Sequence, residues 1–283
     1  SVTSIEDKAF MKCSSLTSIT IPNSVTSIDP GGFYGCTALK KIKIATDNPV
    51  YDSRDNCNAI IETSTNSLIY GCQSTTIPDS VTGIGDWAFS GCSSLASITI
   101  PHGVTSIGEA AFADCSGLAS ITISDSVIRI GDSVFAYCTG LKDVTIQDGV
   151  ISIGYRAFYG CKSLKSITIP DSVSEIKEMA LGYSYDKYWE PIKIDSFIIY
   201  GTKGSATETY AKENGFEGTL PEWLASLVGA QGIKGEKGSD GIDGKSAFEL
   251  AKENGYTGSL QDWLLTLVGQ KGDKGDKGDN GDK

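Results

Sequence analysis

Residues 81–103 read VTGIGDWAFSGCSSLASITIPHG, and residues 104–126 repeat that text closely as VTSIGEAAFADCSGLASITISDS. The shared pattern is V-x-x-I-x-x-x-A-F-x-x-C-x-x-L-x-x-I-x-I, with a period of 23 residues. Clear copies begin at Val2, Val25, Val81, Val104, Val127 and Val150, and a degenerate copy begins at Val173. Self-similarity at a fixed period of this length is typical of solenoid proteins, in which each repeat is one structural unit.

The pattern predicts a strand, a turn and a short helical turn in each repeat. Polar and isoleucine residues alternate in Ser97–Ile100, which predicts a strand with one buried face. Residues 101–103 predict a turn, and we expect Ala111 and Phe112 in a short helical turn. Because a unit of this size cannot bury its apolar side alone, successive units must stack around a shared core of Leu, Ile, Val and Phe.

The phrase L-x-x-I-x-I and the whole unit, as in SVTGIGDWAFSGCSSLASITIP at residues 80–101, resemble the BspA-like leucine-rich repeats of bacterial surface proteins. The resemblance covers roughly residues 1–216. It implies an α/β leucine-rich-repeat solenoid, curved, with a parallel β-sheet on one face and short helical turns. It also implies secretion to the bacterial cell surface and a role in attachment to host or neighbouring cells.

The pattern and its interruptions predict five segments. Residues 1–200 form the solenoid, and residues 45–80 break the period with a hairpin-like insertion whose loop is Thr63–Asn66. Residues 201–229 are a helical cap and first tail module, with Ser205 capping a helix that ends near Gly215. A second helical tail module, residues 244–269, repeats the text of the first.

The remaining tail segments are collagen-like. Glycine recurs at every third position through residues 230–243 and 270–283, as required where three chains wind around one axis. Neither run contains proline, so we expect these triplets to be disordered in a lone chain. A homotrimer formed through this tail is the structural alternative for the function of the chain.

Charge and hydropathy exclude several classes of partner. The net charge of −11 argues against a nucleic-acid surface, which needs clustered Lys and Arg, and against docking on anionic lipid. No apolar run is long enough for a membrane-spanning helix. The sequence begins inside a repeat, so we expect it to be part of a longer protein.

The eight cysteines divide into two groups. Six share one position of the repeat, where we expect buried, reduced thiols in a ladder: Cys13, Cys36, Cys92, Cys115, Cys138 and Cys161. Cys57 and Cys72 flank the predicted hairpin, and both a disulfide and two further core thiols are open for that pair.

Two surfaces are candidate binding sites. The first is a polar strip made of the residues that alternate with buried isoleucine: Ser97, Thr99, Ser120, Thr122, Asp143, Thr145, Ser166 and Thr168, preceded by Ser18, Thr20, Lys41 and Lys43. The alternative for this strip is a solvated sheet face without a partner. The second is the aromatic-rich stretch with Tyr183, Tyr185, Tyr188 and Trp189, which could equally be ordinary packing of the terminal unit.

Nothing in the sequence recommends catalysis. His102 is the only histidine, so a catalytic triad has no evident neighbour and a histidine-based metal site lacks ligands. Residues 239–246 resemble a phosphate-binding loop but lack its first glycine and the preceding strand. We therefore predict a non-catalytic adhesion or ligand-binding protein with no cofactor and no metal, whose partner is a host or bacterial surface protein or glycan. A lost catalytic domain outside this sequence is a third alternative.

Overall fold

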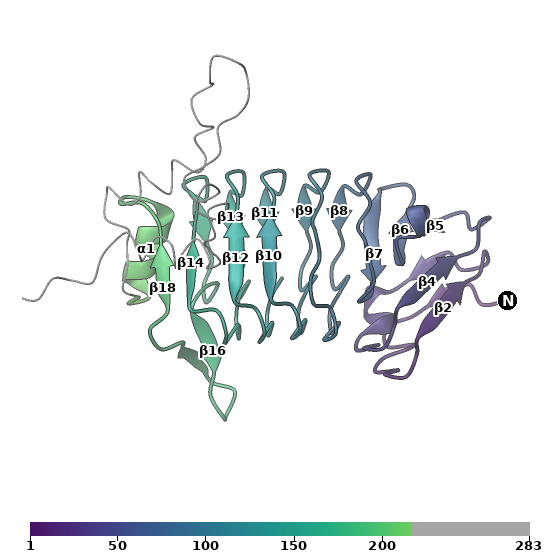
Figure 1. Ribbon diagram of the computed structural model, residues 1–283, viewed down its shortest axis with the longest axis horizontal. Coiled ribbons are helices and arrows are strands. Elements are labelled where there is room, and N and C mark those ends of the chain that lie inside the picture. The colour runs from purple at the N-terminus through teal and green to yellow at the C-terminus, as the bar shows by residue number, and fades with distance from the viewer. Residues whose placement is uncertain (217–283) are drawn as a thin grey trace, which may run out of the picture. The chain divides into compact units, whose positions relative to one another are not determined.

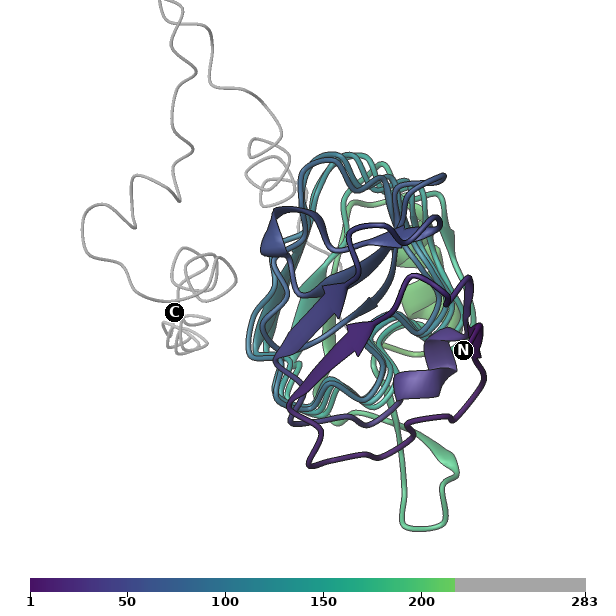
Figure 2. The same ribbon diagram turned by 90° about the vertical axis from the view of Figure 1, so that its right-hand side faces the viewer.

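The computed structural model describes residues 1–216, which lie within the compact unit Ser1–Glu222. The predicted tail modules and collagen-like runs beyond residue 216 lie outside the described residues. Within this unit the repeats stack as successive coils, seen side by side in Figure 1. Viewed from the side turned by 90°, the coils from the middle of the unit superimpose (Figure 2), because each 23-residue repeat traces the same path.

The longest sheet has eight strands in the order β15-β13-β11-β9-β8-β7-β6-β5. From β7 to β15 all neighbouring strands are parallel. Equivalent residues of successive coils pair with each other, as Ser106 does with Arg129 and Ile107 with Ile130. Its regular strands are two residues long and come from the V-x-x-I phrase: β8 (Gly83–Ile84), β9 (Ser106–Ile107), β11 (Arg129–Ile130), β13 (Ser152–Ile153) and β15 (Glu175–Ile176). In the first coils, β1 (Ser4–Ile5) and β3 (Ser27–Ile28) pair in the same way.

The L-x-x-I-x-I phrase, predicted to form the parallel sheet, instead forms separate two-stranded parallel pairs. Two copies pair as β2 (Ser18–Ile21) with β4 (Lys41–Ile44), and two as β10 (Ser120–Ile123) with β12 (Asp143–Ile146). A fifth copy, β14 (Ser166–Thr168), pairs with β18 (Ile198–Tyr200), which is not a copy of the phrase. Residues 95–100 follow the same path but are not in a strand. The prediction of one buried face holds, since Ile121 and Ile123 are buried while Ser120 and Thr122 are exposed.

The predicted short helical turn at the Ala-Phe pair is wrong for most coils. The residue before this pair adopts a left-handed conformation, with φ of 60° at Trp87, 51° at Ala110 and 57° at Ser133. Its N–H donates to the following coil, as Trp87 N does to Glu109 O at 2.8 Å, and Phe89 N likewise reaches Ala111 O at 2.7 Å. These bonds between coils alternate with bonds within the turn, such as that from Ser90 N to Trp87 O at 2.9 Å, so the continuous bond pattern of a helix does not form. The second coil, which begins at Val25, is different, because a 3₁₀ turn, η1, spans Pro30–Phe33.

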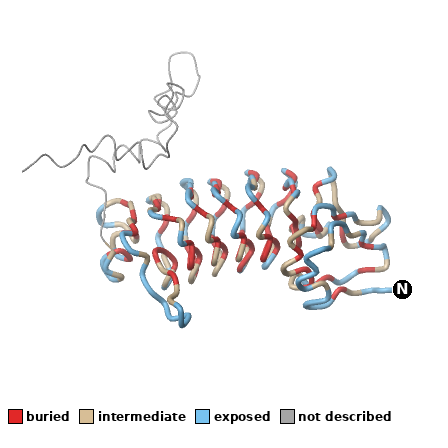
Figure 3. The backbone as a smooth tube through the Cα atoms, turned by 60° about the horizontal axis from the view of Figure 1, so that its bottom comes forward, coloured by how far each residue is buried: buried red, intermediate tan, exposed pale blue. Residues whose placement is uncertain are grey.

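The core is a set of ladders that run from coil to coil. Phe89, Phe112, Phe135 and Phe158 stack with ring centroids 4.9, 5.4 and 5.2 Å apart. Each repeat cysteine of these coils donates its thiol to a carbonyl of the preceding coil, as Cys138 Sγ does to Phe112 O at 3.1 Å. Burial of this kind is visible in Figure 3 as red segments that recur at the same place in each coil.

The interruption contains the predicted hairpin. Strands β6 (Ala59–Glu62) and β7 (Ser67–Gly71) pair antiparallel with Glu62 opposite Ser67, and β5 (Tyr51–Asp52) with the 3₁₀ turn η2 (Arg54–Asn56) precedes them. The hairpin separates two hydrophobic clusters, because Ile60 and Tyr70 pack with the first coils while Ile61 and Leu68 pack with the later ones. The insertion is therefore an elaborated coil of the same stack.

The last described coil ends in a hairpin and a helix. Residues 191–200 contribute two strands with different partners. Strand β17 (Pro191–Lys193) pairs antiparallel with β16 (Tyr183–Tyr185), and this hairpin projects from the stack in Figures 1 and 2. The predicted helix is present as α1 (Ala206–Glu213), with Ser205 Oγ accepting the Glu208 N–H at 3.3 Å.

Candidate functional site

The structure brings the centre of the predicted polar strip together. Strand register places Ser120 beside Asp143 and Thr122 beside Thr145, and all four are exposed. At one end Ser97 and Thr99 are exposed, although their segment is not in a strand. Register likewise places Ser18 and Thr20 beside Lys41 and Lys43 in the first coils. Strand pairing thus joins the polar strip across neighbouring coils at its centre, between Ser120 and Asp143 and between Thr122 and Thr145.

The other end of the strip is less open. Ser166 and Thr168 are half-buried, and β18 covers that side by placing Ile198 and Tyr200 next to them. The Thr168 hydroxyl is buried without a hydrogen-bond partner in the described structure. These two residues are therefore poorly placed for contact with a ligand, and a binding role for the rest of the strip stays a prediction.

The predicted aromatic stretch divides into packing and surface residues. Tyr183 belongs to the terminal unit, because its hydroxyl donates to Asn214 Oδ1 at 2.9 Å and its ring meets the edge of Phe216. Tyr188 and Trp189 lie in the turn between β16 and β17, and each residue is 70% exposed. Tyr183 is therefore part of the packing of the terminal unit, and a binding role for Tyr188 and Trp189 stays a prediction.

Tyr185 anchors the exposed aromatic rings to the stack. Trp189 stacks on it with centroids 4.6 Å apart and planes at 15°, and the Lys162 ammonium lies 3.8 Å from the centroid of the same ring. A stacked ring and a cation this close must occupy opposite faces of Tyr185. On its edge Tyr185 meets Tyr137 at 5.5 Å, and Tyr159 lies beside both. We call Tyr137, Tyr159, Tyr185, Tyr188 and Trp189 the aromatic cluster.

The charges around the cluster are cationic on the side of the stack. The Arg156 guanidinium lies 4.7 Å from the centroid of the Tyr159 ring, a cation–π arrangement like that of Lys162 on Tyr185. Burial raises the pKa of Tyr159, so its hydroxyl stays protonated and neutral. A third cation, the Lys187 ammonium, lies 4.8 Å from the centroid of the exposed Tyr188 ring.

The turn of the hairpin holds the exposed rings in place. The Asp186 carboxylate accepts the N–H groups of Tyr188 at 2.7 Å and Glu190 at 3.0 Å. Trp189 has a φ of 66°, a left-handed conformation that costs a bulky residue on the order of 1–3 kcal/mol. The turn thus fixes the backbone that carries both exposed rings.

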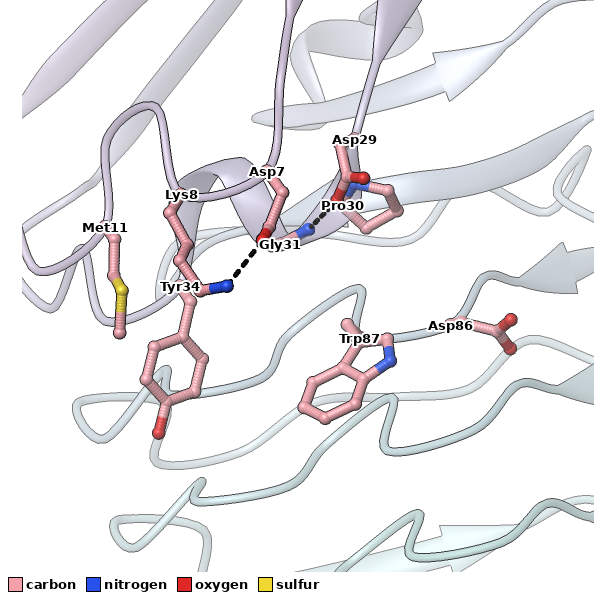
Figure 4. Close-up of a pocket in the computed structure, with 9 residues that line it drawn as sticks. All are labelled: Asp7, Lys8, Met11, Asp29, Pro30, Gly31, Tyr34, Asp86 and Trp87. Atoms are coloured by element: carbon pink, nitrogen blue, oxygen red, sulfur yellow. Dashed lines mark hydrogen bonds and ion pairs between the residues drawn. The ribbon is translucent and has the colours of Figure 1, made fainter.

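A groove lies where the interruption breaks the row of turns. It has a volume of about 590 Å³ and is lined by Asp7, Lys8, Met11, Asp29, Pro30, Gly31, Tyr34, Asp86 and Trp87. Figure 4 shows Trp87 across the opening from Lys8 and Gly31, with Tyr34 and Met11 at one side. The sequence analysis missed this groove, because its two walls are more than 50 residues apart in the sequence.

The thiols agree with the ladder prediction at five of six repeat positions. Cys36, Cys92, Cys115, Cys138 and Cys161 are buried and free, whereas Cys13 is exposed. Burial raises the pKa of Cys92 and Cys138 to about 12, so neither is a reactive thiolate at neutral pH.

Cys57 and Cys72 are also free and buried. A register shift between Ile60 and Ile61 pairs Ala59 with Gly71, so the two cysteines are not directly opposite. Each thiol instead hydrogen-bonds locally, Cys72 Sγ to Asn58 O at 3.5 Å and Cys57 Sγ with Ser53 Oγ at 3.6 Å.

His102 lies in an exposed turn, with its Nδ1 3.1 Å from Asp125 Oδ1. Among residues 1–216, no group of three or more His, Cys, Asp or Glu side chains is placed to hold a metal ion. No helix in that same part of the chain is long and apolar enough to cross a membrane.

The repeat pattern matches one family model. Six copies of the region described as "BspA type Leucine rich repeat region" match residues 1–69 and 63–186. The chain belongs to this family. A search of curated proteins found no match.

Solved structures share the BspA-type fold. A leucine-rich repeat protein from Eubacterium ventriosum is 24% identical, with a TM-score of 0.52 over 80% of this chain and 63% of that one. The pneumococcal vaccine antigen PcpA is 18% identical, with a TM-score of 0.53 over 73% of this chain and 56% of that one. The chain spans less than two thirds of both proteins, and the likeness shows the fold alone.

Within the BspA-type repeat, the residues that sequence reasoning missed occupy variable positions near the Ala-Phe pair. Tyr137 and Tyr159 follow the ladder residues Phe135 and Phe158, and Trp87 directly precedes its Ala-Phe pair. All three are on the turn side of their coils. Large aromatic residues at these otherwise variable positions were the available signal.

Proposed function

We propose that this BspA-type chain is a non-catalytic adhesion or ligand-binding protein of a bacterial cell surface, and that the aromatic cluster contacts its partner. The exposure of Tyr188 and Trp189 is the observation that carries the proposal. Tyr188 and Trp189 are adjacent on a projecting hairpin, and each residue is 70% exposed. Aromatic area left in solvent does not stabilise the stack, and an exposed apolar patch of this kind is typical of an interaction site.

The chemistry of the cluster favours a protein partner. Trp, Tyr and Arg dominate the residues whose truncation weakens protein interfaces most, and the cluster with Arg156 contains all three types. Because Tyr185 is fixed between Trp189 and Lys162, little side-chain freedom is lost when a partner binds. A partner that covers the free face of Trp189 would gain about 1.5–3 kcal/mol from the ring.

The polar strip has a secondary role in this proposal. Its centre offers hydroxyls, and Asp143 adds the one carboxylate among the four paired residues. Side chains of this type suit the hydrated rim of an interface better than its core.

The test compares binding by matched variants of the full chain. Labelled wild-type protein is applied to arrays of host and bacterial surface proteins and to a glycan array, beside Tyr188→Ala/Trp189→Ala and a strip variant, Thr122→Lys/Thr145→Lys. We expect binding to a surface protein that the aromatic variant loses and the strip variant retains in large part. Binding to glycans alone would replace the class of partner, and loss in the strip variant alone would place the site on the strip.

The structural alternative, a fibre or stalk component, depends on the glycine-every-third-residue runs of the tail sequence. Sedimentation of the full chain at tens of micromolar distinguishes it: a trimer supports assembly through the tail, and a monomer counts against it.

A further inference from the structure

The groove at the interruption is a second surface, separate from the aromatic cluster. In the regular stack, the N–H of the residue at the Trp87 position bonds to the next coil, as Trp87 N does to Glu109 O. Gly31 occupies the same position in coil 2, and its N–H turns back to Asp29 Oδ1 at 2.8 Å. The insertion has a hairpin where a regular repeat has this turn. The surface turn that would cover Gly31 is therefore missing, and the groove lies in its place.

The core beneath the groove is intact. Tyr70 of the hairpin stacks on Phe33 with centroids 4.8 Å apart, and its hydroxyl donates to Phe33 O at 3.2 Å. In regular coils that carbonyl bond comes from a cysteine thiol, as with Cys36 Sγ and Phe10 O. The missing surface turn therefore leaves the interior filled.

One end of the groove is closed by Tyr34. Its ring lies against Gly91, where an added Cβ would be 3.2 Å from a ring carbon, and its hydroxyl donates to Asp114 Oδ2 at 3.0 Å. The two walls thus approach each other at Gly91 and separate toward Gly31 and Trp87. This geometry fixes the groove in the folded state.

The lining combines apolar surface with negative charge. Trp87 is 43% exposed and Met11 37% exposed, so both offer apolar area to a bound group. Asp7, Asp29 and Asp86 also line the groove, and Lys8, whose ammonium lies 2.6 Å from Asp7 Oδ2, is its one cation. Asp86 is partly engaged, since its Oδ1 accepts the Glu109 N–H at 2.7 Å.

We propose that this groove binds a Lys or Arg side chain carried on an extended peptide segment of a partner protein. A guanidinium or ammonium group can lie over the Trp87 ring and bond to the carboxylates of Asp7 and Asp29. The groove volume is within the range of pockets that hold small-molecule ligands, roughly 300–1,000 Å³, which leaves room for the peptide segment as well as its basic side chain. A metal ion is the less suitable occupant, because an aromatic wall offers it no ligand and the described residues hold no metal-binding group.

The experiment follows the indole N–H of Trp87 by NMR in the full ¹⁵N-labelled chain. The sequence has four tryptophans, so the Trp87 signal is assigned by its loss in Trp87→Gly. That variant removes the ring and also relieves the left-handed backbone, whose φ is 60°, so it should fold. Ser133→Gly is the matched control, because Ser133 occupies the same repeat position with a φ of 57° and does not line the groove.

The probe is an acetylated, amidated Gly-Lys-Arg-Gly peptide, compared with Gly-Gln-Gln-Gly. We expect a saturable shift of the Trp87 indole with the basic peptide, unchanged in Ser133→Gly. In Asp7→Asn/Asp29→Asn, binding should weaken at least about fivefold, as loss of charge-assisted bonds predicts. The proposal is overturned if the Trp87 signal does not move up to about 1 mM peptide, or moves equally with the neutral peptide. It is also overturned if only the Trp189 signal shifts, which would assign the basic peptide to the aromatic cluster.

Discussion

The hydroxyl of Tyr210 on α1 lies 3.1 Å from the backbone nitrogen of Leu181 and 3.0 Å from its carbonyl oxygen. In the regular coils those two bonds come from the next coil: Phe158 N donates to Ala180 O, and Phe135 O accepts the thiol of Cys161. One side chain of the terminal helix therefore satisfies both backbone groups of the last ladder residue. The helix ends the stack by supplying what another repeat would have supplied.

Removing this hydroxyl tests the role of the terminal helix. We expect Tyr210→Phe to lower the free energy of unfolding by about 1–3 kcal/mol, because it leaves a buried N–H and a buried carbonyl without partners. Tyr183→Phe is the control, since that hydroxyl bonds to an Asn214 side chain that is only partly buried. Urea unfolding followed by circular dichroism measures both. Equal stability of Tyr210→Phe and wild type would contradict the assigned role.

Gly71 tests the contact between the insertion and the regular stack. A Cβ added there would lie 2.2 Å from Phe89 Cε1, and the ring is fully buried. We expect Gly71→Ala to destabilise the protein by about 1–3 kcal/mol, as overpacking in a filled core does.

Gly204→Ala is the comparison for Gly71→Ala. At Gly204 nothing lies within 4 Å of an added Cβ, and only the φ of 84° opposes the substitution. Its cost should be about 1 kcal/mol. A smaller loss of stability in Gly71→Ala than in Gly204→Ala would mean that the hairpin does not pack on Phe89.

Stability should fall at alkaline pH. Burial raises the pKa of Cys92 and Cys138 to about 12 and raises the pKa values of Cys115 and Cys161 as well. In the unfolded chain a thiol titrates near pH 8.5. The folded state therefore binds more protons above that pH, and the contribution of each thiol is complete below about pH 8.5 and is lost as the pH rises toward about 12.

The measurement is the urea midpoint at about pH 8 and about pH 10. We expect a lower midpoint at the higher pH, with each buried thiol contributing up to about 1.4 kcal/mol per pH unit in this window. Cys138→Ala should show a smaller decrease between the two values than wild type. A midpoint that is constant or rises with pH would contradict the burial of the ladder.

The stacked fold was predictable because the repeat is regular where packing dictates residue type. Positions such as Phe112 and Cys115 face the core in the four coils that begin at residues 81, 104, 127 and 150, so the same letters recur there. The hairpin of the insertion was equally accessible, since Glu62 opposite Ser67 follows from the loop length. The turn at the Ala-Phe pair was predicted wrongly as helical, because every second N–H there bonds to the next coil and only the others bond within the turn.

The candidate surfaces were only partly predictable. Tyr188 and Trp189 stood out in the sequence, but Tyr137 joins them from another coil through folding. The groove could not be foreseen, because Gly31 and Trp87 become its facing walls only when the hairpin takes the place of a turn. A groove formed between two repeats that are distant in the sequence leaves no local pattern there.

The central claim is that successive coils stack around a sealed interior, which the hairpin divides into two hydrophobic clusters, and leave only their outer surface for binding. Counting reactive thiols tests it most directly. In native protein at about pH 8, without reductant, we predict that one thiol, the exposed Cys13, reacts with a thiol reagent, whereas all eight react after unfolding in urea. Several reactive thiols in the native protein would contradict the sealed ladder, and six after unfolding would contradict the free state of Cys57 and Cys72.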